Sequence, residues 1–376
     1  MIINQFQKDI DLILSYFLNV ILQFYFLLMK FSNTLIYWQL QNNRELPWRK
    51  TKNPYFIWLS EIMLQQTRVA QGMSYYLEFT AHFPSVFDLA KADESTVLKM
   101  WQGLGYYSRA RNLHFTAKQI ANELNGKFPS TYKEIIKLKG IGDYTASAIA
   151  SICFNEPTAV VDGNVYRVLS RYFGIKTAIN SSAGIKEFKL LAQTLLDETK
   201  PGTYNQALMD FGALHCKPQN PLCETCPFAD SCVALERKLT KELPVKDKKI
   251  KVRNRYFNFL VIKTNDNKTI LSERKGKGIW QGLYEFPLIE SDDNIAKDEI
   301  VSSEKFINLF PDETTISLFN KKEIIHKLSH QHLHTQFWVV ETASLSKAKI
   351  NWKDIKKYPV PVLIANFIEE FESKSN

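Results

Sequence analysis

Four cysteines crowd into 17 residues near the middle of the chain, with the spacing Cys216-x6-Cys223-x2-Cys226-x5-Cys232. The fifth cysteine, Cys153, stands alone in an apolar segment, as a small buried hydrophobic residue would. An odd count clustered in this way argues against a secreted disulfide scaffold and for a metal site in a reducing compartment. Four thiolates satisfy either zinc or an iron–sulfur cluster, and the spacing alone leaves that choice open.

The composition places the chain among folded proteins with more than one domain. Its 376 residues suggest two or three domains, and 45% hydrophobic with 23% charged residues excludes a disordered or collagen-like chain. The formal net charge of +9 favours a polyanionic partner, with nucleic acid ahead of a membrane surface. A solvated basic face without a partner would explain the charge equally well.

The N-terminal segment is unusual because Leu12–Met29 contains no charged residue. Its length approaches that of a membrane helix, since a bilayer core of about 30 Å needs about 20 residues. A signal peptide is disfavoured because Lys8 is followed by Asp9 and no small-residue cleavage site appears. We expect translation to begin at Met29, which makes 1–28 an uncertain hydrophobic extension. A membrane-attached form follows only if these residues are translated.

The rest of the chain divides into three expected parts. Residues 29–237 show apolar residues at helical spacing with short Gly and Pro breaks, which predicts an all-α domain. Residues 238–255 carry eight Lys or Arg against two acidic residues and predict an exposed basic linker. Residues 256–376 contain β-type runs and predict an α+β domain. These runs are Tyr256–Lys263, Thr269–Ser272 and Thr335–Glu341.

A glycine-rich turn at 139–143 separates two apolar helical segments. Gly140 and Gly142 permit a tight hairpin, and the amides that open the second helix can donate hydrogen bonds to an anion. Such a hairpin can hold a DNA phosphate without reading the sequence. It can also serve simply as a connection between two packed helices, and the sequence does not separate these interpretations.

Two carboxylates suggest acid–base chemistry. Glu61 lies on a helical pattern among apolar residues such as Leu59 and Ile62, so burial should raise its pKa and favour its acid form. Asp162 precedes another helical segment, where the commoner role of an aspartate is to cap the helix. A protonated carboxyl beside an ionised one is the arrangement that cleaves glycosidic bonds.

Several motifs, taken in order, resemble the helix-hairpin-helix DNA glycosylases, and most closely the adenine DNA glycosylases. The N-terminal set is LPWR (46–49), PYFIWLSEIMLQQT (54–67), WQGLGYYSRARNL (101–113), GIGDYTASAIA (140–150), VDGNVYRVLSR (161–171) and NQALMDFGALHC (205–216). The C-terminal set is WQGLYEFP (280–287), LSHQHLH (328–334) and YPVP (358–361), in a part similar to Nudix hydrolases. The resemblance thus implies a helical glycosylase core followed by a Nudix-like domain.

The resemblance implies removal of adenine from double-stranded DNA where it is mispaired with 8-oxoguanine or guanine. Glu61 would protonate adenine, Asp162 would stabilise the positive sugar, and Asn164 would support that aspartate. Tyr144 stands where related lyases have a Schiff-base lysine, which implies a glycosylase that does not cut the strand. The open alternatives are a lyase of the endonuclease III type that removes damaged pyrimidines, and a non-catalytic iron–sulfur protein that binds DNA.

The same resemblance assigns residues to DNA contact. It places Arg49 and Trp48 at the base pocket, the hairpin glycines at a phosphate, and a further set on the 8-oxoguanine strand. That set consists of Gln66, Thr67, Leu104 and Tyr106 with Ser329 and His330 of the C-terminal part. One departure is Lys139, where the family usually has proline before the first hairpin glycine.

The resemblance also implies a [4Fe–4S] cluster on the four clustered cysteines. The Nudix catalytic box is absent after Gly282, so the C-terminal domain is expected to recognise a base and not to hydrolyse nucleotides. Its histidines at 330, 332 and 334 alternate along a predicted strand and offer a weaker possibility of a second metal site. We expect a monomer in the cytoplasm, associated with the nucleoid.

Overall fold

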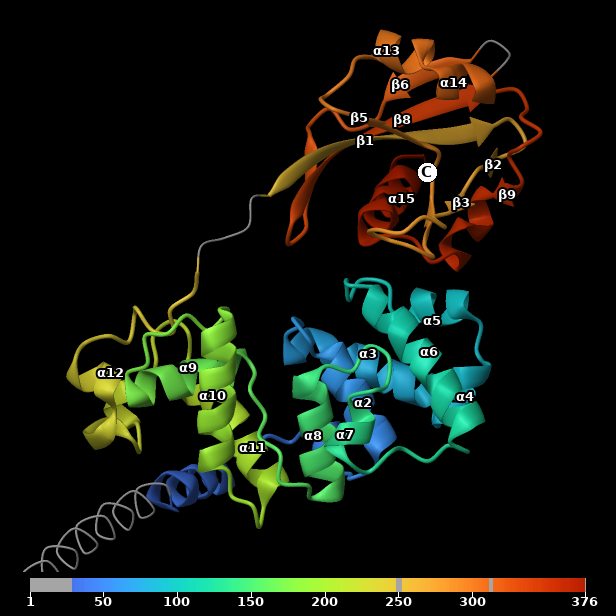
Figure 1. Cartoon of the computed structure of the whole chain (residues 1–376). Helices are drawn as coiled ribbons and strands as arrows, with labels where there is room; N and C mark the ends of the chain where they lie inside the picture. Colours follow the sequence, from blue (N-terminus) through green and yellow to red (C-terminus); the bar gives the residue numbers. More distant parts are fainter. Residues whose placement is uncertain (1–28, 248–251, 311–313, 376) are drawn as a thin grey trace, which may run out of the picture. The chain divides into compact units, whose positions relative to one another are not determined.

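The computed structural model describes residues 29–247, 252–310 and 314–375, so the expectations on 1–28 lie outside it. The chain forms two compact units, each built from two stretches of sequence (Figure 1). Of the described residues, unit 1 comprises 29–65 and 124–247, and unit 2 comprises 66–123, 252–310 and 314–375. The helices that follow Gln66 therefore group with the C-terminal part, which differs from the expected division at 237.

Unit 1 is helical throughout its described residues. It opens with a helix over 29–41, and local signals set the later helix ends: Asn53 caps one helix, Ser181 caps another, and Gly174 ends a third in the left-handed conformation. The named elements are η1 (Pro47–Arg49), α2 (Pro54–Met63), α7 (Tyr132–Ile135), α8 (Asp143–Phe154), α9 (Gly163–Phe173), α10 (Ser182–Leu195), α11 (Pro201–Asp210), the π-helical turn η2 (Phe211–His215), η3 (Cys223–Thr225), η4 (Ala229–Ser231) and α12 (Val233–Glu236).

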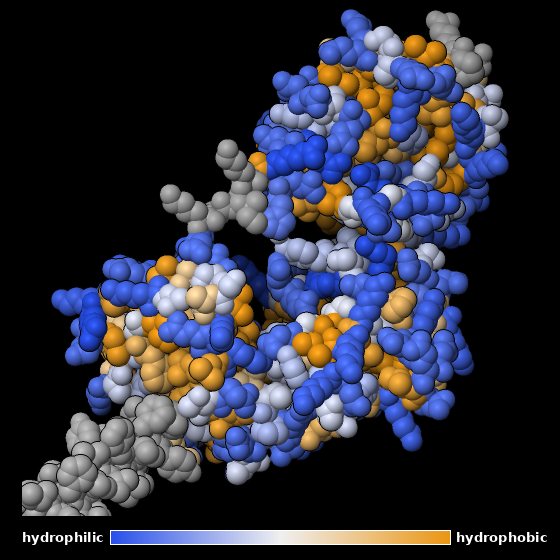
Figure 2. Space-filling model, viewed as in Figure 1, coloured by the Kyte–Doolittle hydropathy of each residue, from blue (hydrophilic) through white to orange (hydrophobic). Residues whose placement is uncertain are grey.

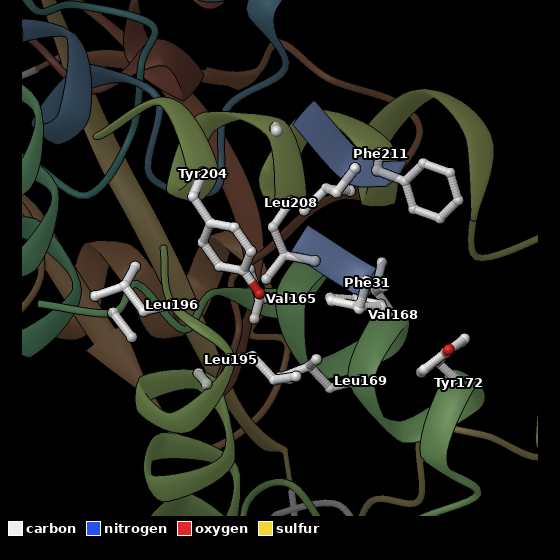
Figure 3. Close-up of a cluster of buried hydrophobic side chains, with 14 of the residues drawn as sticks. Phe31, Val165, Val168, Leu169, Tyr172, Leu195, Leu196, Tyr204, Leu208 and Phe211 are labelled. Carbon is white, nitrogen blue, oxygen red and sulfur yellow. The ribbon is translucent and has the colours of Figure 1, made fainter. Parts of the chain in front are cut away.

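The core of unit 1 forms around α9 (Figure 3). Val165, Val168, Leu169 and Tyr172 recur at the helical period, so one face of α9 is buried against α10 and α11. Phe31 of the first helix packs its ring 4.9 Å from that of Tyr172. The N-terminal end of α9 is thereby fixed in place, which matters because Asp162 immediately precedes it.

Unit 2 combines four helices from its first stretch of sequence with a mixed sheet from its second, in the strand order β5-β1-β8-β6 with β7 also paired to β8. Strands β1 and β8 run parallel, and the other pairs of this sheet are antiparallel. The helices are α3 (Val69–His82), α4 (Val86–Lys91), α5 (Glu94–Met100) and α6 (Ser108–Glu123), and the sheet strands are β1 (Arg253–Thr264), β5 (Leu288–Ser291), β6 (Thr315–Leu318), β7 (Ile324–Lys327) and β8 (Gln331–Thr342). Small pairs and a short helix complete it: β2 (Lys268–Thr269) with β9 (Ile350–Asn351), β3 (Ser272–Glu273) with β4 (Tyr284–Glu285), and η5 (Trp352–Lys357).

Helices cover both faces of this sheet, as Figure 1 shows. Leu260 and Trp338 pack with α13 (Lys297–Ser302) and α14 (Glu304–Leu309) on one face. On the other face, the ring of Phe337 stacks 4.0 Å from that of Phe367 in α15 (Val362–Ser375). Both central strands are buried on both sides, which explains why β1 reads as an almost continuous apolar run.

The expected fold class is confirmed, whereas the expected linker folds differently. No strand occurs within residues 29–247, and the predicted strand segments fall in β1, β2 with β3, and β8. Leu243, inside the expected linker, is buried and its carbonyl accepts a hydrogen bond from Arg171. Strand β1 already begins at Arg253. The expected linker contains apolar side chains among its lysines, and these bring its first part onto unit 1.

Hydrophilic residues cover most of the surface that Figure 2 shows, with apolar residues in smaller patches between them. Within the described residues, no helix combines the length and apolar character needed to cross a bilayer.

Candidate active site and cluster loop

Glu61 lies near the end of α2, where the helix packs on α8. Asn53 caps this helix by accepting a hydrogen bond from the Tyr55 amide, and Pro54 occupies its first position. The flanking Ser60 and Ile62 are buried, and Glu61 itself is half-buried. The local sequence therefore forces a carboxyl group onto an otherwise apolar helix.

The hydroxyl of Tyr144, on α8, donates a hydrogen bond of 2.5 Å to Glu61 Oε2. Burial raises the pKa of Glu61 to about 7, and the hydrogen bond from Tyr144 opposes that rise. The charge of Asp162 raises this pKa further, whereas Arg49 lowers it. A carboxyl with this pKa is substantially protonated at neutral pH, as a general acid must be. The structure thus brings together four residues that the sequence singled out.

Asp162 is the N-cap of α9, as the structural interpretation of the sequence expected. Its Oδ1 accepts hydrogen bonds from the amides of Asn164 (2.8 Å) and Val165 (2.7 Å), and its Oδ2 accepts one from Asn164 Nδ2 (2.7 Å). Burial raises the pKa of Asp162, and these hydrogen bonds lower it by stabilising the charged form. The capping hydrogen bonds hold the Asp162 carboxylate in one orientation. A carboxylate that is fixed in this way can also serve a second role at the site.

Sequence reasoning did not single out Asp210, the last residue of α11. This buried aspartate forms ion pairs with Arg49 and Arg44. It therefore holds Arg49, whose positive charge acts on Glu61. A single acidic residue within the apolar run ALMDFGAL was the available signal, since a buried charge requires a partner.

The glycine hairpin opens α8. Gly140 has φ +79°, a conformation that favours glycine, whereas Gly142 caps α8 with an ordinary φ of −94°. A Cβ built at Gly142 would meet no atom within 4 Å. Folding therefore does not require glycine at 142, which leaves close approach of a ligand as a reason for it.

The four clustered cysteines line one cavity with Arg171. Burial raises the pKa of Cys223, Cys226 and Cys232, and the neighbouring Cys216 thiol adds to each rise. Within the described residues, no group of three or more ligand side chains converges on the site of a single metal ion. Four thiols around one cavity are the donor set of a zinc ion or of an iron–sulfur cluster.

Two buried arginines of α9 connect the cysteine loop to its surroundings. The sequence analysis did not single them out. Arg167 donates hydrogen bonds to the Cys216 carbonyl (2.7 Å) and to Asn164 Oδ1 (2.8 Å). Arg171 donates to Cys216 Sγ (3.4 Å) and to the Lys217 carbonyl (2.8 Å). Arg167 therefore links the cysteine loop directly to the residue that holds Asp162.

In unit 2, Tyr106 and Ser329 meet although 223 positions separate them in sequence, with a hydrogen bond of 2.5 Å between their hydroxyls. They line a cavity of about 750 Å³ together with Leu104 and His330. Tyr106 has the strained φ of +48° and is 47% exposed, whereas Leu104 is buried in the cavity wall. The structure therefore presents the ring of Tyr106, and not Leu104, at the surface.

The remaining predicted contacts are less constrained. Gln66 is exposed with φ +56°, and Thr67 is half-buried beside it. On β8, His334 Nδ1 pairs with Glu323 at 2.7 Å. No metal-binding group was found among the described histidines, cysteines and acidic residues, so nothing supports the second metal site.

Comparison with family models divides the chain in three. Residues 59–193 match the HhH-GPD superfamily of base excision DNA repair proteins. Residues 216–232 match the iron–sulfur binding domain of endonuclease III, and residues 258–370 match the NUDIX domain. The cysteine loop is thus an iron–sulfur binding segment, in agreement with a [4Fe–4S] cofactor.

Curated relatives extend the similarity over most of the chain. An adenine DNA glycosylase of Buchnera aphidicola subsp. Baizongia pistaciae (strain Bp) is 38% identical over 314 residues, covering 82% of this chain and 86% of the relative. One of Buchnera aphidicola subsp. Acyrthosiphon pisum (strain APS) is 32% identical, covering 91% and 97%. Among solved structures, a thermostable thymine-DNA glycosylase aligns with a TM-score of 0.52 and 32% identity, covering 56% of this chain and 97% of that one.

Proposed function

Since this chain belongs to the adenine DNA glycosylase family and is a base excision repair DNA glycosylase, we propose that it hydrolyses the N-glycosidic bond of adenine mispaired with 8-oxoguanine or guanine in double-stranded DNA. One observation carries the proposal. The half-buried carboxyl of Glu61 accepts a hydrogen bond from Tyr144, and it lies close enough to Asp162 that the charge of Asp162 raises its pKa. The target base leaves the stack before reaction, because the half-buried Glu61 and Asp162 cannot reach a base that stays stacked in a duplex.

Glu61 acts as the general acid. It transfers its proton to a ring nitrogen of adenine as the bond between C1′ and N9 breaks and its electron pair moves to N9. The resulting carboxylate then accepts a proton from the water that adds to C1′. A pKa of about 7 suits both steps, since the acid form must be populated before cleavage and the base form after it.

Asp162 stabilises the positive sugar that cleavage leaves behind. Its hydrogen bonds from Asn164 and Val165 favour the carboxylate form, and they fix its orientation before the charge develops. Asn164 is therefore a positioning residue for Asp162. The two carboxyl groups take different roles because burial raises the pKa of Glu61 to about 7, whereas at Asp162 three hydrogen bonds oppose the rise in pKa that burial causes.

Tyr144 makes the enzyme a monofunctional glycosylase. Its phenol cannot form a Schiff base with the sugar, so the DNA strand stays intact after base release. Its hydroxyl instead donates to Glu61 and orients the acid.

The DNA contacts follow from the exposed and cavity-lining groups. We assign Arg49 to the base pocket, and Gly140 and Gly142 to a backbone phosphate. Gln66, Thr67, Leu104, Tyr106, Ser329 and His330 contact the strand that carries 8-oxoguanine. The protein acts as a monomer on nucleoid DNA.

Cys216, Cys223, Cys226 and Cys232 are the proposed ligands of the [4Fe–4S] cluster. These four thiolates would hold the cluster and close the loop around it, and because they would fill every protein ligand position the site has a structural role and not one in bond cleavage. Arg167 and Arg171 keep the loop on α9.

The test is single-turnover adenine release by Glu61→Gln and Asp162→Asn. Each substitution keeps the side-chain size but removes the proton or the charge, and each should slow release from both A:8-oxoguanine and A:G duplexes by about a hundredfold or more. Glu45→Gln, at an exposed carboxylate of unit 1, is the control and should retain the wild-type rate.

Strand breaks should appear only after alkali. Breaks without alkali, together with a protein–DNA adduct formed when borohydride reduces a Schiff base, would instead identify a lyase. Unchanged release in both variants would leave a DNA-binding protein whose carboxylates are only structural.

A further inference from the structure

The tetrapeptide Trp-Gln-Gly-Leu occurs twice in unit 2, at 101–104 and at 280–283. Both tryptophans are buried, and both glycines have positive φ, +102° at Gly103 and +81° at Gly282. The first copy follows α5 in the helical part of the unit, and the second lies between β3 and β4 in the sheet part. Each copy presents its glutamine to the other part.

The contacts between the two parts are reciprocal. Arg111 of α6 donates from Nη1 to the Gln281 carbonyl (2.5 Å) and from Nη2 to Gln281 Oε1 (3.4 Å). In return, Gln102 Oε1 accepts from the Val360 amide across the contact (3.3 Å), and Lys99 Nζ of the same helical part donates a second hydrogen bond to it (3.0 Å). We call these five residues the clasp.

The two parts are in close contact at Gly282, whose φ of +81° also favours glycine. A Cβ at Gly282 would lie 3.1 Å from Leu98 Cδ1 and 3.4 Å from Glu94 Oε1. Within the helical part, the Tyr75 hydroxyl donates to the Gln102 carbonyl and lies 2.3 Å from where a Cβ at Gly103 would stand, so the first tetrapeptide is itself tightly packed. The clasp therefore belongs to a tightly fitted surface.

The hydrogen bond between Tyr106 and Ser329 spans the same two parts. Tyr106 follows the first tetrapeptide by two residues, and its hydroxyl is exposed, so water competes for the bond. Half-buried Arg111 instead makes charge-assisted hydrogen bonds, which are stronger than those between neutral groups. The stronger contact and the weaker one therefore join the same two parts of unit 2.

We propose that Arg111 is a positioning residue that, through the clasp, sets the separation of Tyr106 and Ser329 and thereby the preference for 8-oxoguanine over guanine opposite the adenine. The catalytic part of this inference rests on the proposed function, whereas the structural part does not.

The experiment uses the full-length holoenzyme in five variants. These are Arg111→Met, which keeps an apolar stem, Arg111→Lys, Ser329→Ala, the double variant Arg111→Met with Ser329→Ala, and Lys118→Met as a control on the exposed face of the same helix. Single-turnover rates with A:8-oxoguanine and A:G duplexes give the preference. Amide hydrogen exchange of the free protein over 103–107 and 328–331 reports the geometry without DNA.

Arg111→Met should lower the preference for A:8-oxoguanine over A:G at least fivefold and speed amide exchange over 103–107 and 328–331. Arg111→Lys should restore part of the preference and part of the protection from exchange. The double variant should lose no more preference than the worse single variant, because both changes act on one contact. Lys118→Met should match wild type.

The inference would be overturned if amide exchange in Arg111→Met were as slow as in wild type. It would also be overturned if the double variant lost preference by the product of the two single-variant losses. A wild-type enzyme without any preference would overturn the proposed mispair specificity, and the exchange data would still decide whether the clasp positions the two segments.

Discussion

At the scale of single residues, environment gives two carboxyl groups opposite tasks. Glu61 is surrounded by apolar side chains and receives one hydrogen bond, so burial dominates and its pKa rises to about 7. Asp162 is also buried, but three hydrogen bonds to its oxygens stabilise its charge. The difference lies in the number of donors, since a donor to a carboxylate lowers its pKa.

This balance predicts the pH dependence of adenine release. Because the proton of Glu61 is required, the rate should be high below about pH 7 and fall as pH rises through the Glu61 pKa. Tyr144→Phe removes the hydrogen bond that lowers this pKa, so the fall should move to higher pH even if the maximal rate declines. Single-turnover rates across pH measure the midpoint, with the exposed Tyr37→Phe as control. An unmoved midpoint, or one at lower pH, would contradict the role of the hydrogen bond.

At the scale of elements, the sequence predicted the helices that bear the candidate catalytic residues. It did not predict the residues whose long-range contacts hold these helices in place. The apolar environment of Glu61, the hairpin at 140–142 and the cap at Asp162 are local patterns, readable within a few residues. Arg167 reaches Cys216, 49 positions away, and Arg49 reaches Asp210, 161 positions away. Such partners become visible only when the fold brings α9, η2 and the cysteine loop together.

The hairpin yields a prediction that separates its two interpretations. Gly142→Ala should change the free energy of unfolding by less than about 1 kcal/mol, because φ is ordinary, the space is open, and the lost N-cap preference roughly offsets the stiffer unfolded chain. If an anion approaches this amide closely, the methyl group should weaken DNA binding about tenfold. Thermal unfolding and the Kd for an A:8-oxoguanine duplex, in the Glu61→Gln background, measure both. Gly276→Ala, also in open space, is the control, and unchanged affinity would favour a plain connection.

At the scale of the whole molecule, the sequence predicted the two fold classes but did not predict that Gln66–Glu123 packs with the C-terminal part. The all-α and α+β regions follow from periodicity, which is local. The grouping of Gln66–Glu123 with the C-terminal part depends on contacts such as Arg111 with Gln281, which 170 positions separate. No periodic pattern encodes such a pairing. The repeated tetrapeptide at 101–104 and 280–283 marks both sides of this contact in the sequence. The hydrogen bonds of Gln102 and Gln281 show what the repeat does.

Because the net charge is +9, we expect salt to weaken the affinity for DNA strongly and to change the rate of catalysis little. Contacts to phosphates release counterions, so neutralising about six of them would weaken binding roughly a thousandfold between about 50 and 200 mM salt. Proton transfer from Glu61 takes place at a half-buried group, where screening is weaker, so the rate of the saturated complex should change by less than about twofold. Kd values in the Glu61→Gln background and wild-type single-turnover rates at saturating enzyme measure the two effects. A Kd independent of salt would exclude phosphate contacts as the main source of affinity, and a saturated rate that fell with Kd would show that the acid is not shielded.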